Sequence, residues 1–508
     1  MNLSRRSQIL LLCLLVNILV FLLLFVSQPG VNDNKPGSYG KLSGKELPFT
    51  VVISEFEEFE NDISSTVKSI LAALPGVNIL IVSKKIPYPP FDIPEAENVK
   101  IIVRDQPANN PQQWGDPICY IKTKYVLIVP DAVRLQNVQQ LIKFDFENLY
   151  GPDGVRIAAF HIDDQYQCTE LTVNLRQWKL SYKENPDERV CDAITGSSNV
   201  ILLFPTSCLM NLSQPFLRPY PDALFIQFAA KGWKTIVRED KIFTEGKDLF
   251  TDGHKRWKAG QKKNERLFKL YKRFGIKLVN ENGIDNWYGC SKETMRCFGT
   301  VVDDMPEYIY EGRWTPPCCM RNLKETTRYV FRILVEAGVS YWLEGGSLLG
   351  AVRSGDLIPW DYDVDVGIYQ HEINKCSQLR HVQESAEKKY VDDHGFVWEK
   401  AREGEFFRVQ FSETNHLHVD IFPFYEKNGI MTKNTWFKTH RQDSEFPAHY
   451  LKPLTTLDFA GIKAFVPNNY REFLELKFGK GVIENPQFPN PKKIKKRKAR
   501  ILEKGDVM

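Results

Sequence analysis

The sequence has almost no excess of charge of one sign. Its 508 residues include 67 Lys and Arg against 63 Asp and Glu, which gives a formal net charge of +4. So small a charge creates no strong field around the molecule, and this argues against a protein that recruits nucleic acid or another polyanion. Hydrophobic residues make up 43% of the chain, which excludes disorder throughout. The length predicts two domains with accessory segments.

The apolar run near the N-terminus lacks a small-x-small cleavage site. Residues 9–26 are almost entirely apolar and long enough to span a bilayer, and Ser-Gln-Pro-Gly follows them. Arg5 and Arg6 precede the run, which predicts a cytoplasmic tail at 1–8 and a retained signal anchor. Residues 27–47 read as a flexible stem, so the bulk of a type II membrane protein would be lumenal. A signal peptide that is removed is the alternative.

A first α/β domain is predicted for residues 48–250. The apolar segments FTVVIS, NILIVS, VKIIV, YVLIV and RIAAF alternate with helical patterns, which indicates a mainly parallel sheet. This layout resembles a glycosyltransferase of the A type, in which a strand ends in a metal-binding Asp-x-Asp. The strand YVLIVPDAV ends in a single aspartate, Asp131, instead of this motif. Asp163 and Asp164 are interpreted as solvated loop residues. We therefore expect a degenerate, non-catalytic domain, with catalysis through Asp131 as the alternative.

The remaining chain divides into three parts. Residues 251–275 are charged and predict a linker helix, interpreted as solvated rather than as a patch for an acidic glycan. Residues 276–490 form the predicted second domain, of α+β type with a mixed sheet. The basic tail, 491–508, is predicted to be disordered.

The cysteines follow no standard CxxC spacing. Cys168 and Cys191 are predicted to form a disulfide, because an oxidising lumen favours pairing. Four further thiols could hold a structural zinc ion or form two disulfides, and their spacing leaves both open: Cys290, Cys297, Cys318 and Cys319. The pairing of Cys119 and Cys208 is not predicted.

The segment WLEGGSLLGAVRSGDLIPWDYDVD carries the predicted chemistry. A strand leads into Gly345, Gly346 and Ser347 at the start of a helix, where backbone N–H groups and a hydroxyl can approach phosphate oxygens. Arg353 follows on that helix and is expected to offset charge on a substrate. Trp360 is expected to pack in the core or to lie beside a nucleotide base.

Three aspartates follow in alternation. On a strand, Asp361, Asp363 and Asp365 would share one face. Three carboxylates so close together repel one another unless a cation compensates, and oxygen ligands select magnesium or manganese. The pattern predicts metal-dependent transfer of a phosphate-containing group from a nucleotide donor.

Two further regions complete the predicted site. In HLHVDIF, Asp420 is expected to bind metal or to act as general base, with His418 as the alternative base. Two polar clusters are candidates for reading the base and ribose of the nucleotide, and they comprise Gln442 and Asp443 in the first, and Asn485, Pro486 and Gln487 in the second.

The motifs EGGSLLGAVRSGDLIPWDYDVDVGI, HVDIFPF and PNNYREFLELKFG resemble the LicD family, which has a nucleotidyltransferase fold and whose bacterial members transfer phosphocholine from CDP-choline. With the anchor, the first domain and the WTPPCC loop, nearly the whole chain resembles the vertebrate fukutin-related family. That resemblance implies transfer of ribitol 5-phosphate from CDP-ribitol to a ribitol phosphate on the O-mannosyl glycan of α-dystroglycan, with release of CMP. It also implies magnesium at the aspartates and zinc at the four cysteines.

The expected protein is therefore a Golgi membrane enzyme with a lumenal catalytic part. Homo-oligomers and associations with related Golgi transferases are expected partners, and nucleic acid is not. A glycosyltransferase or a non-enzymatic Golgi scaffold, each acting through the first domain, remains the alternative.

Overall fold

The computed structural model describes residues 47–104, 116–151, 154–162, 166–187, 189–196, 199–296, 298, 301–302, 305–437, 440 and 442–486. The predicted tail, signal anchor and basic C-terminus lie outside these residues, as do nearly all of the predicted stem and the pair Asp163 and Asp164. No helix within the described ranges is both long and apolar enough to cross a membrane.

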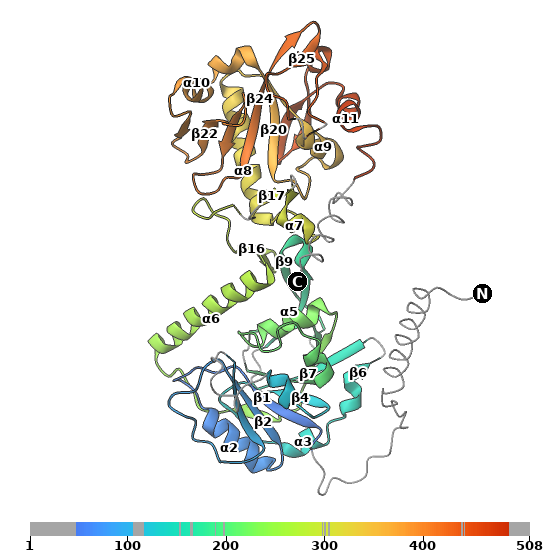
Figure 1. The fold of residues 1–508 in the computed structure, drawn as a ribbon. Helices are drawn as coiled ribbons and strands as arrows, with labels where there is room; N and C mark the ends of the chain where they lie inside the picture. The colour runs from blue at the N-terminus through green and yellow to red at the C-terminus, as the bar shows by residue number, and fades with distance from the viewer. Residues whose placement is uncertain are drawn as a thin grey trace, which may run out of the picture. The chain divides into compact units, whose positions relative to one another are not determined.

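A mixed sheet forms the centre of the first domain (Figure 1). Among the described residues it has nine strands, in the order β10 (Val190–Cys191), β13 (Lys234–Arg238), β7 (Gly154–His161), β12 (Val200–Pro205), β4 (Tyr125–Ile128), β1 (Phe49–Ile53), β2 (Asn78–Ser83) and β3 (Val99–Val103), with β6 (Tyr150–Gly151) beside β7. β1 to β4 pair in parallel, as predicted, but β12 runs antiparallel to both of its neighbours.

Helices bury the apolar faces that the sequence pattern indicates. α2 (Ile63–Ala73) buries Ile63, Val67 and Ile70, and α5 (Asp222–Ala230) is buried over most of its length. The shorter elements of this domain are α3 (Val138–Ile142), α4 (Thr206–Met210) and the pair β5 (Val133–Leu135) and β14 (Phe243–Glu245).

A second sheet joins residues on both sides of the predicted linker. Its order is β11 (Ala193–Thr195), β8 (Gln167–Asn174), β9 (Lys179–Glu184), β15 (Leu278–Glu281) and β16 (Ile284–Trp287). The predicted disulfide between Cys168 and Cys191 is present. The charged segment forms α6 (Gly253–Phe274), as expected, and β15 pairs with β9 immediately after it. Strand pairing with the first domain therefore continues past residue 276.

The C-terminal part is built on a mixed sheet of its own. The order is β19 (Tyr341–Leu343), β20 (Asp363–Tyr369), β24 (His418–Lys427), β23 (Phe407–Gln410), β22 (Val397–Lys400) and β21 (Lys389–Val391), and β25 (Ile430–Thr432) and β26 (Phe446–Pro447) extend it from β24. β20 and β24 run parallel, side by side in Figure 1. Trp342 is fully buried on Gly367, where an added Cβ would lie 2.3 Å from the indole ring.

Helices pack around this sheet. α8 (Pro317–Glu336) contacts β20, β23 and β24, α9 (Gly345–Ser354) contacts β20 and α11 (Tyr470–Phe478), and α10 (Ser377–Glu384) contacts β22. The remaining elements are α7 (Glu307–Tyr310) and the strand pairs β17 (Val301–Val302) with β18 (Met305–Pro306) and β27 (Thr455–Phe459) with β28 (Ile462–Val466). One continuous apolar core holds these elements together.

Candidate active site

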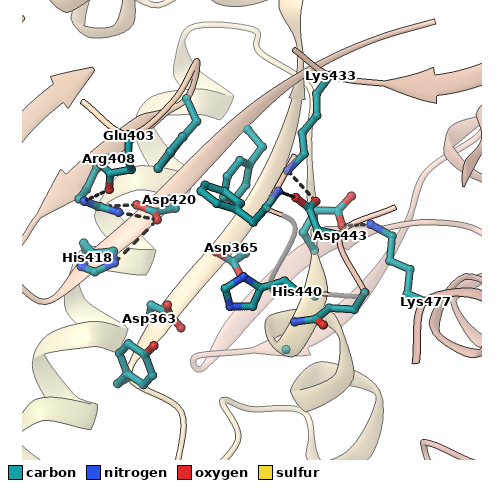
Figure 2. A pocket seen from close by; sticks show the side chains of 18 of the residues that line it. Asp363, Asp365, Glu403, Arg408, His418, Asp420, Lys433, His440, Asp443 and Lys477 are labelled. Atoms are coloured by element: carbon teal, nitrogen blue, oxygen red, sulfur yellow. Dashed lines mark hydrogen bonds and ion pairs between the residues drawn. The ribbon is translucent and has the colours of Figure 1, made fainter. Parts of the chain in front are cut away.

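A cavity of about 380 Å³ lies where β20 and β24 begin (Figure 2). Acidic side chains of the two strands form part of its wall, and aromatic and basic side chains form much of the rest. The residues that line it include Glu344, Gly345, Gly346, Asp363, Asp365, Glu403, Phe406, Arg408, His418, Asp420, Phe422, Phe424, Lys433, Phe437, His440, Gln442, Asp443 and Lys477.

The strand register brings the acidic residues together. β20 and β24 are parallel neighbours in which Asp363 lies opposite His418 and Asp365 opposite Asp420. Because side chains alternate along a strand, all four point to the same face. The alternation that the sequence indicates for Asp363 and Asp365 is present in the structure.

Asp361 lies next to the cavity without lining it, and it is positioned in a different way from the one predicted. It precedes β20 and so does not share the strand alternation. Instead, its N–H donates to the carbonyl of Ile358 at 2.9 Å, and its carbonyl accepts a hydrogen bond from Thr315 Oγ1 at 2.6 Å. The loop held in this way turns the carboxylate toward the first turn of α9, where an added Cβ at Gly346 would lie 2.7 Å from Asp361 Oδ2.

The two glycines leave room between α9 and the aspartates. Gly345 has a φ of +49°, and an added Cβ would lie 3.3 Å from Asp365 Oδ2. Any side chain at Gly345 or Gly346 would therefore enter the space beside the carboxylates. Ser347 is buried and does not line the cavity, and its Oγ accepts the N–H of Asp365 at 3.0 Å. This bond ties the helix to the strand.

Burial and mutual repulsion shape the electrostatics of the aspartates. Burial, followed by the charge of Asp365, raises the pKa of Asp361 to about 7. Burial and the neighbouring carboxylates also raise the pKa of Asp363 and of Asp365 well above the ordinary value. The charge of Lys433 opposes this rise at Asp365. The cluster therefore favours any positive charge that enters it.

Asp420 is held by an arginine, as Figure 2 shows. Arg408 donates from Nε to Oδ1 at 2.8 Å and from its terminal nitrogen to Oδ2 at 3.0 Å. Arg408 also contacts Glu403 at 2.9 Å. Both oxygens of Asp420 therefore already accept charge-assisted hydrogen bonds.

His418 has a defined tautomer when neutral. Its Nδ1 lies 2.9 Å from the carbonyl oxygen of His416, and a carbonyl only accepts, so Nδ1 carries the hydrogen. Nε2 is then the nitrogen with a free lone pair, and it lies 3.8 Å from Asp420 Oδ2 at the cavity wall.

Two buried lysines that were not predicted as site residues lie on the other side of the cavity. Lys433 Nζ lies 2.7 Å from Asp443 Oδ1, and Lys477 Nζ lies 2.6 Å from Glu344 Oε2. Phe422 and Phe424 also line the wall. Their positions follow from the alternation of β24 after Asp420, so the motif HVDIFPF contained that signal. Lys433 follows β25 in a loop, and no local pattern marks it.

Several predicted residues lie elsewhere. Arg353 does not line the cavity, because its guanidinium donates to the carbonyls of Val482 and Ile483. Trp360 packs against the core, and Asn485 closes a local turn onto Gly481. Asn485 and Pro486 are exposed and outside the cavity wall, and Gln487 lies outside the described residues. Gln442 and Asp443 do line the cavity, although Asp443 is engaged with Lys433.

Of the four cysteines predicted to bind zinc, the three within the described residues lie in disulfides and not as free thiolates. Cys290 and Cys318 form a disulfide, and Cys319 is disulfide-bonded too. Cys297 lies outside the described residues. Zinc takes thiolates, and sulfurs in disulfides are not available as thiolates. The arrangement corresponds to the disulfide alternative that the spacing left open.

The aspartates, unlike these cysteines, have the chemistry that a metal ion requires. No group of three or more His, Cys, Asp or Glu in the described part of the chain has the arrangement of a formed metal site. The cavity nevertheless offers what a hard divalent cation requires, namely carboxylate oxygens whose pKa is raised by burial and repulsion, beside glycines that leave space.

Asp131 of the first domain has structural partners. Its two oxygens accept the N–H of Asp62 at 3.2 and 3.0 Å, and Oδ1 also accepts the N–H of Ala132 at 2.6 Å. Asp62 is the residue before α2, so Asp131 fixes the start of that helix. Its burial raises its pKa to about 6.

Comparisons with known proteins find matches for two parts of the chain. Residues 38–282 match the family described as "Fukutin-related protein stem domain", and residues 338–469 match "LicD/FKTN/FKRP, nucleotidyltransferase domain". The ribitol 5-phosphate transferase FKRP of Mus musculus is 45% identical, over 97% of this chain and 98% of that protein. The protein of that name from Homo sapiens is 44% identical over the same shares. The ribitol-5-phosphate transferase FKTN of Mus musculus is 26% identical over 35% of this chain and 36% of that protein.

Proposed function

The chain belongs to the family of the ribitol 5-phosphate transferase FKRP, and we propose that it transfers ribitol 5-phosphate from CDP-ribitol onto a glycan, with release of CMP. The proposed acceptor is a ribitol phosphate on the O-mannosyl glycan of α-dystroglycan. The observation that carries the proposal is the set of repelling carboxylates facing two glycines at the start of α9.

We assign a magnesium or manganese ion to Asp361, Asp363 and Asp365. When bound, such an ion neutralises phosphate oxygens of the donor and supports in-line displacement. The protein contributes three things around it. Gly345 and Gly346 leave space for the phosphates, Ser347 fixes Asp365, and the loop at Thr315 fixes Asp361.

The acceptor hydroxyl needs a group that removes its proton. Asp420 and His418 are the two candidates, and the hydrogen bonds favour His418. Arg408 occupies both oxygens of Asp420, whereas Nε2 of His418 keeps its lone pair and lines the cavity. In this assignment Asp420 lies 3.8 Å from Nε2 and stabilises the protonated ring.

We further propose a type II Golgi membrane protein, anchored through residues 9–26 with its catalytic part in the lumen. The balanced charge, +4 over 508 residues, gives it no general affinity for nucleic acid. Self-association and association with related Golgi transferases are the proposed assemblies.

A donor screen tests this function. The purified lumenal part is given CDP-ribitol, CDP-choline or CDP-glycerol with a phosphorylated glycan acceptor and magnesium, and CMP release is followed. We expect release from CDP-ribitol at a rate at least tenfold above the other two donors. Equal release from CDP-choline would contradict the proposed donor, and no release from any donor would contradict phosphotransfer.

A further inference from the structure

Lys433 is a buried lysine surrounded by aromatic rings, and a purely structural role does not explain why a charged residue stands there. Its side chain is 6% exposed and that of its partner Asp443 is 13% exposed. Its ammonium lies 4.2 Å from the ring centre of Phe422, 5.0 Å from that of Trp436 and 5.7 Å from that of Phe437. Replacing a buried ion pair with apolar side chains is often neutral or stabilising, so stability alone does not require a lysine among these rings.

Lys433 lines the cavity, and its ammonium group has more donors than the described residues supply with oxygen acceptors. Lysine has three N–H bonds, and within the described residues the structure gives Lys433 one oxygen partner, Asp443 Oδ1. The other oxygen of Asp443 accepts the N–H of Phe437 at 2.8 Å, so the carboxylate is fixed from two sides. The lysine is therefore held in place, with capacity for another acceptor.

The charge of Lys433 acts on the predicted reaction centre. It is among the groups that influence the pKa of Asp365, and both residues line the same cavity. Figure 2 shows Lys433 and Asp443 on one side of the cavity, with Asp363 and Asp420 on the other. A substrate phosphate between the two sides would meet the cation-binding carboxylates on one side and an ammonium on the other.

We propose that Lys433 binds a phosphate group of the substrate, held for that contact by Asp443 and the surrounding rings. The inference rests on the proposed function, because it takes the phosphates from the donor or from the phosphorylated acceptor. Asp443 is then a positioning residue for the lysine rather than a reader of the nucleotide base.

Binding measurements on Lys433→Met test the contact. Affinities for CDP and for cytidine are measured by calorimetry with magnesium present. A lost charge-assisted contact weakens CDP binding roughly ten- to a hundredfold and leaves cytidine binding unchanged. If the phosphate belongs to the acceptor, CDP affinity is kept and the KM for the phosphorylated acceptor rises by a similar factor.

Two further variants make the result interpretable. Lys433→Met with Asp443→Asn removes both charges, so it tests the contact without leaving a buried carboxylate unpaired, and it should show the same loss. Lys452→Met is the matched control, because Lys452 forms an exposed ion pair with Glu426 at 2.6 Å outside the cavity wall. It should bind and turn over as the unaltered protein does.

The proposal is overturned if the double variant keeps both the ratio of CDP to cytidine affinity and the acceptor KM. It is also overturned if CDP and cytidine weaken by equal factors. Binding of inorganic pyrophosphate tests the contact of Lys433 independently of whether CDP-ribitol is the donor. If the unaltered protein released no CMP from CDP-ribitol, the proposed function would fail, whereas tighter pyrophosphate binding by the unaltered protein than by the double variant would still support the contact.

Discussion

At the scale of single residues, Asp361 carries the most readily measured consequence of the buried carboxylates. Its pKa is about 7 in the folded protein because of burial and of Asp365, against an ordinary value of 3.8. Between these values the unfolded chain has lost the proton and the folded protein retains it. The folded state therefore binds more protons, and its stability falls as pH rises from about 4 to about 7.

The metal-free protein should thus melt at a lower temperature at pH 7.5 than at pH 5, by roughly 5 °C. Magnesium should remove most of this difference, because it binds the ionised carboxylates. Thermal melting at several pH values, with and without magnesium, measures both effects. The variant Asp361→Asn is the control and should show a smaller fall. A fall of equal size with and without magnesium would contradict the assignment of the ion to this cluster.

Gly346 gives a second prediction at the residue scale. Gly346→Ala places a methyl group 2.7 Å from Asp361 Oδ2, so the carboxylate must move. Because a displacement of about 1 Å at a reaction centre can cost roughly a hundredfold in rate, we expect a loss of that order in kcat. Steady-state CMP release and thermal melting are measured together. Gly260→Ala in exposed α6 has open space around it and is the matched control. Unchanged turnover in Gly346→Ala would show that this space is not used.

At the scale of elements, alternation along β20 and β24 was readable from the sequence. The motif DVDV predicts one face for Asp363 and Asp365, and HVDIFPF extends the same face to Phe422 and Phe424. The position of Asp361 could not be predicted from the sequence, because it depends on a hydrogen bond from Thr315, 46 residues earlier. Lys433 depends in the same way on Asp443 and on rings from β24, which no local pattern could reveal.

The disulfide between Cys290 and Cys318 gives a prediction at the element scale. It joins two residues with a sequence separation of 28, of which Cys318 lies in the first turn of α8. Loop-closure entropy predicts that Cys290→Ser with Cys318→Ser lowers the free energy of unfolding by about 3 to 4 kcal/mol. Denaturant unfolding measures this loss, and a chelator should leave the stability of the unaltered protein unchanged when magnesium is held in excess. One zinc ion per chain, together with a loss of stability on chelation, would instead support the four-cysteine zinc site.

At the scale of the whole molecule, the first α/β domain was predicted from the alternation of apolar segments, and the second, mixed-sheet domain from the motifs that resemble the LicD family. The reversal of β12 in the first sheet could not be predicted, because a strand's direction depends on neighbours distant in sequence. For the same reason, the sequence could not show that β15, which follows the linker helix, pairs with β9 in the five-stranded sheet.

Each domain contains one carboxylate on which a hypothesis about the activity depends. Asp131 is the candidate for a glycosyltransferase, and Asp363 is the candidate for phosphotransfer. Both oxygens of Asp131 accept hydrogen bonds from the backbone N–H at the start of α2, whereas Asp363 lines the cavity among other carboxylates. Asp131→Asn should therefore lower stability and leave the rate of CMP release within about twofold, because it disturbs only the folding of the first domain. If the folded Asp131→Asn variant no longer released CMP, this would favour the glycosyltransferase alternative.

CMP release from CDP-ribitol with magnesium, compared between the unaltered protein and Asp363→Asn, tests the central claim most directly. Asp393→Asn, an exposed aspartate outside the cavity wall, is the control. We expect release by the unaltered protein and by Asp393→Asn, and a loss of at least a thousandfold in Asp363→Asn, with its melting temperature in the absence of magnesium unchanged or raised because a repelling charge is removed. Undiminished release by a folded Asp363→Asn variant would contradict the claim that the carboxylates of β20 perform the transfer.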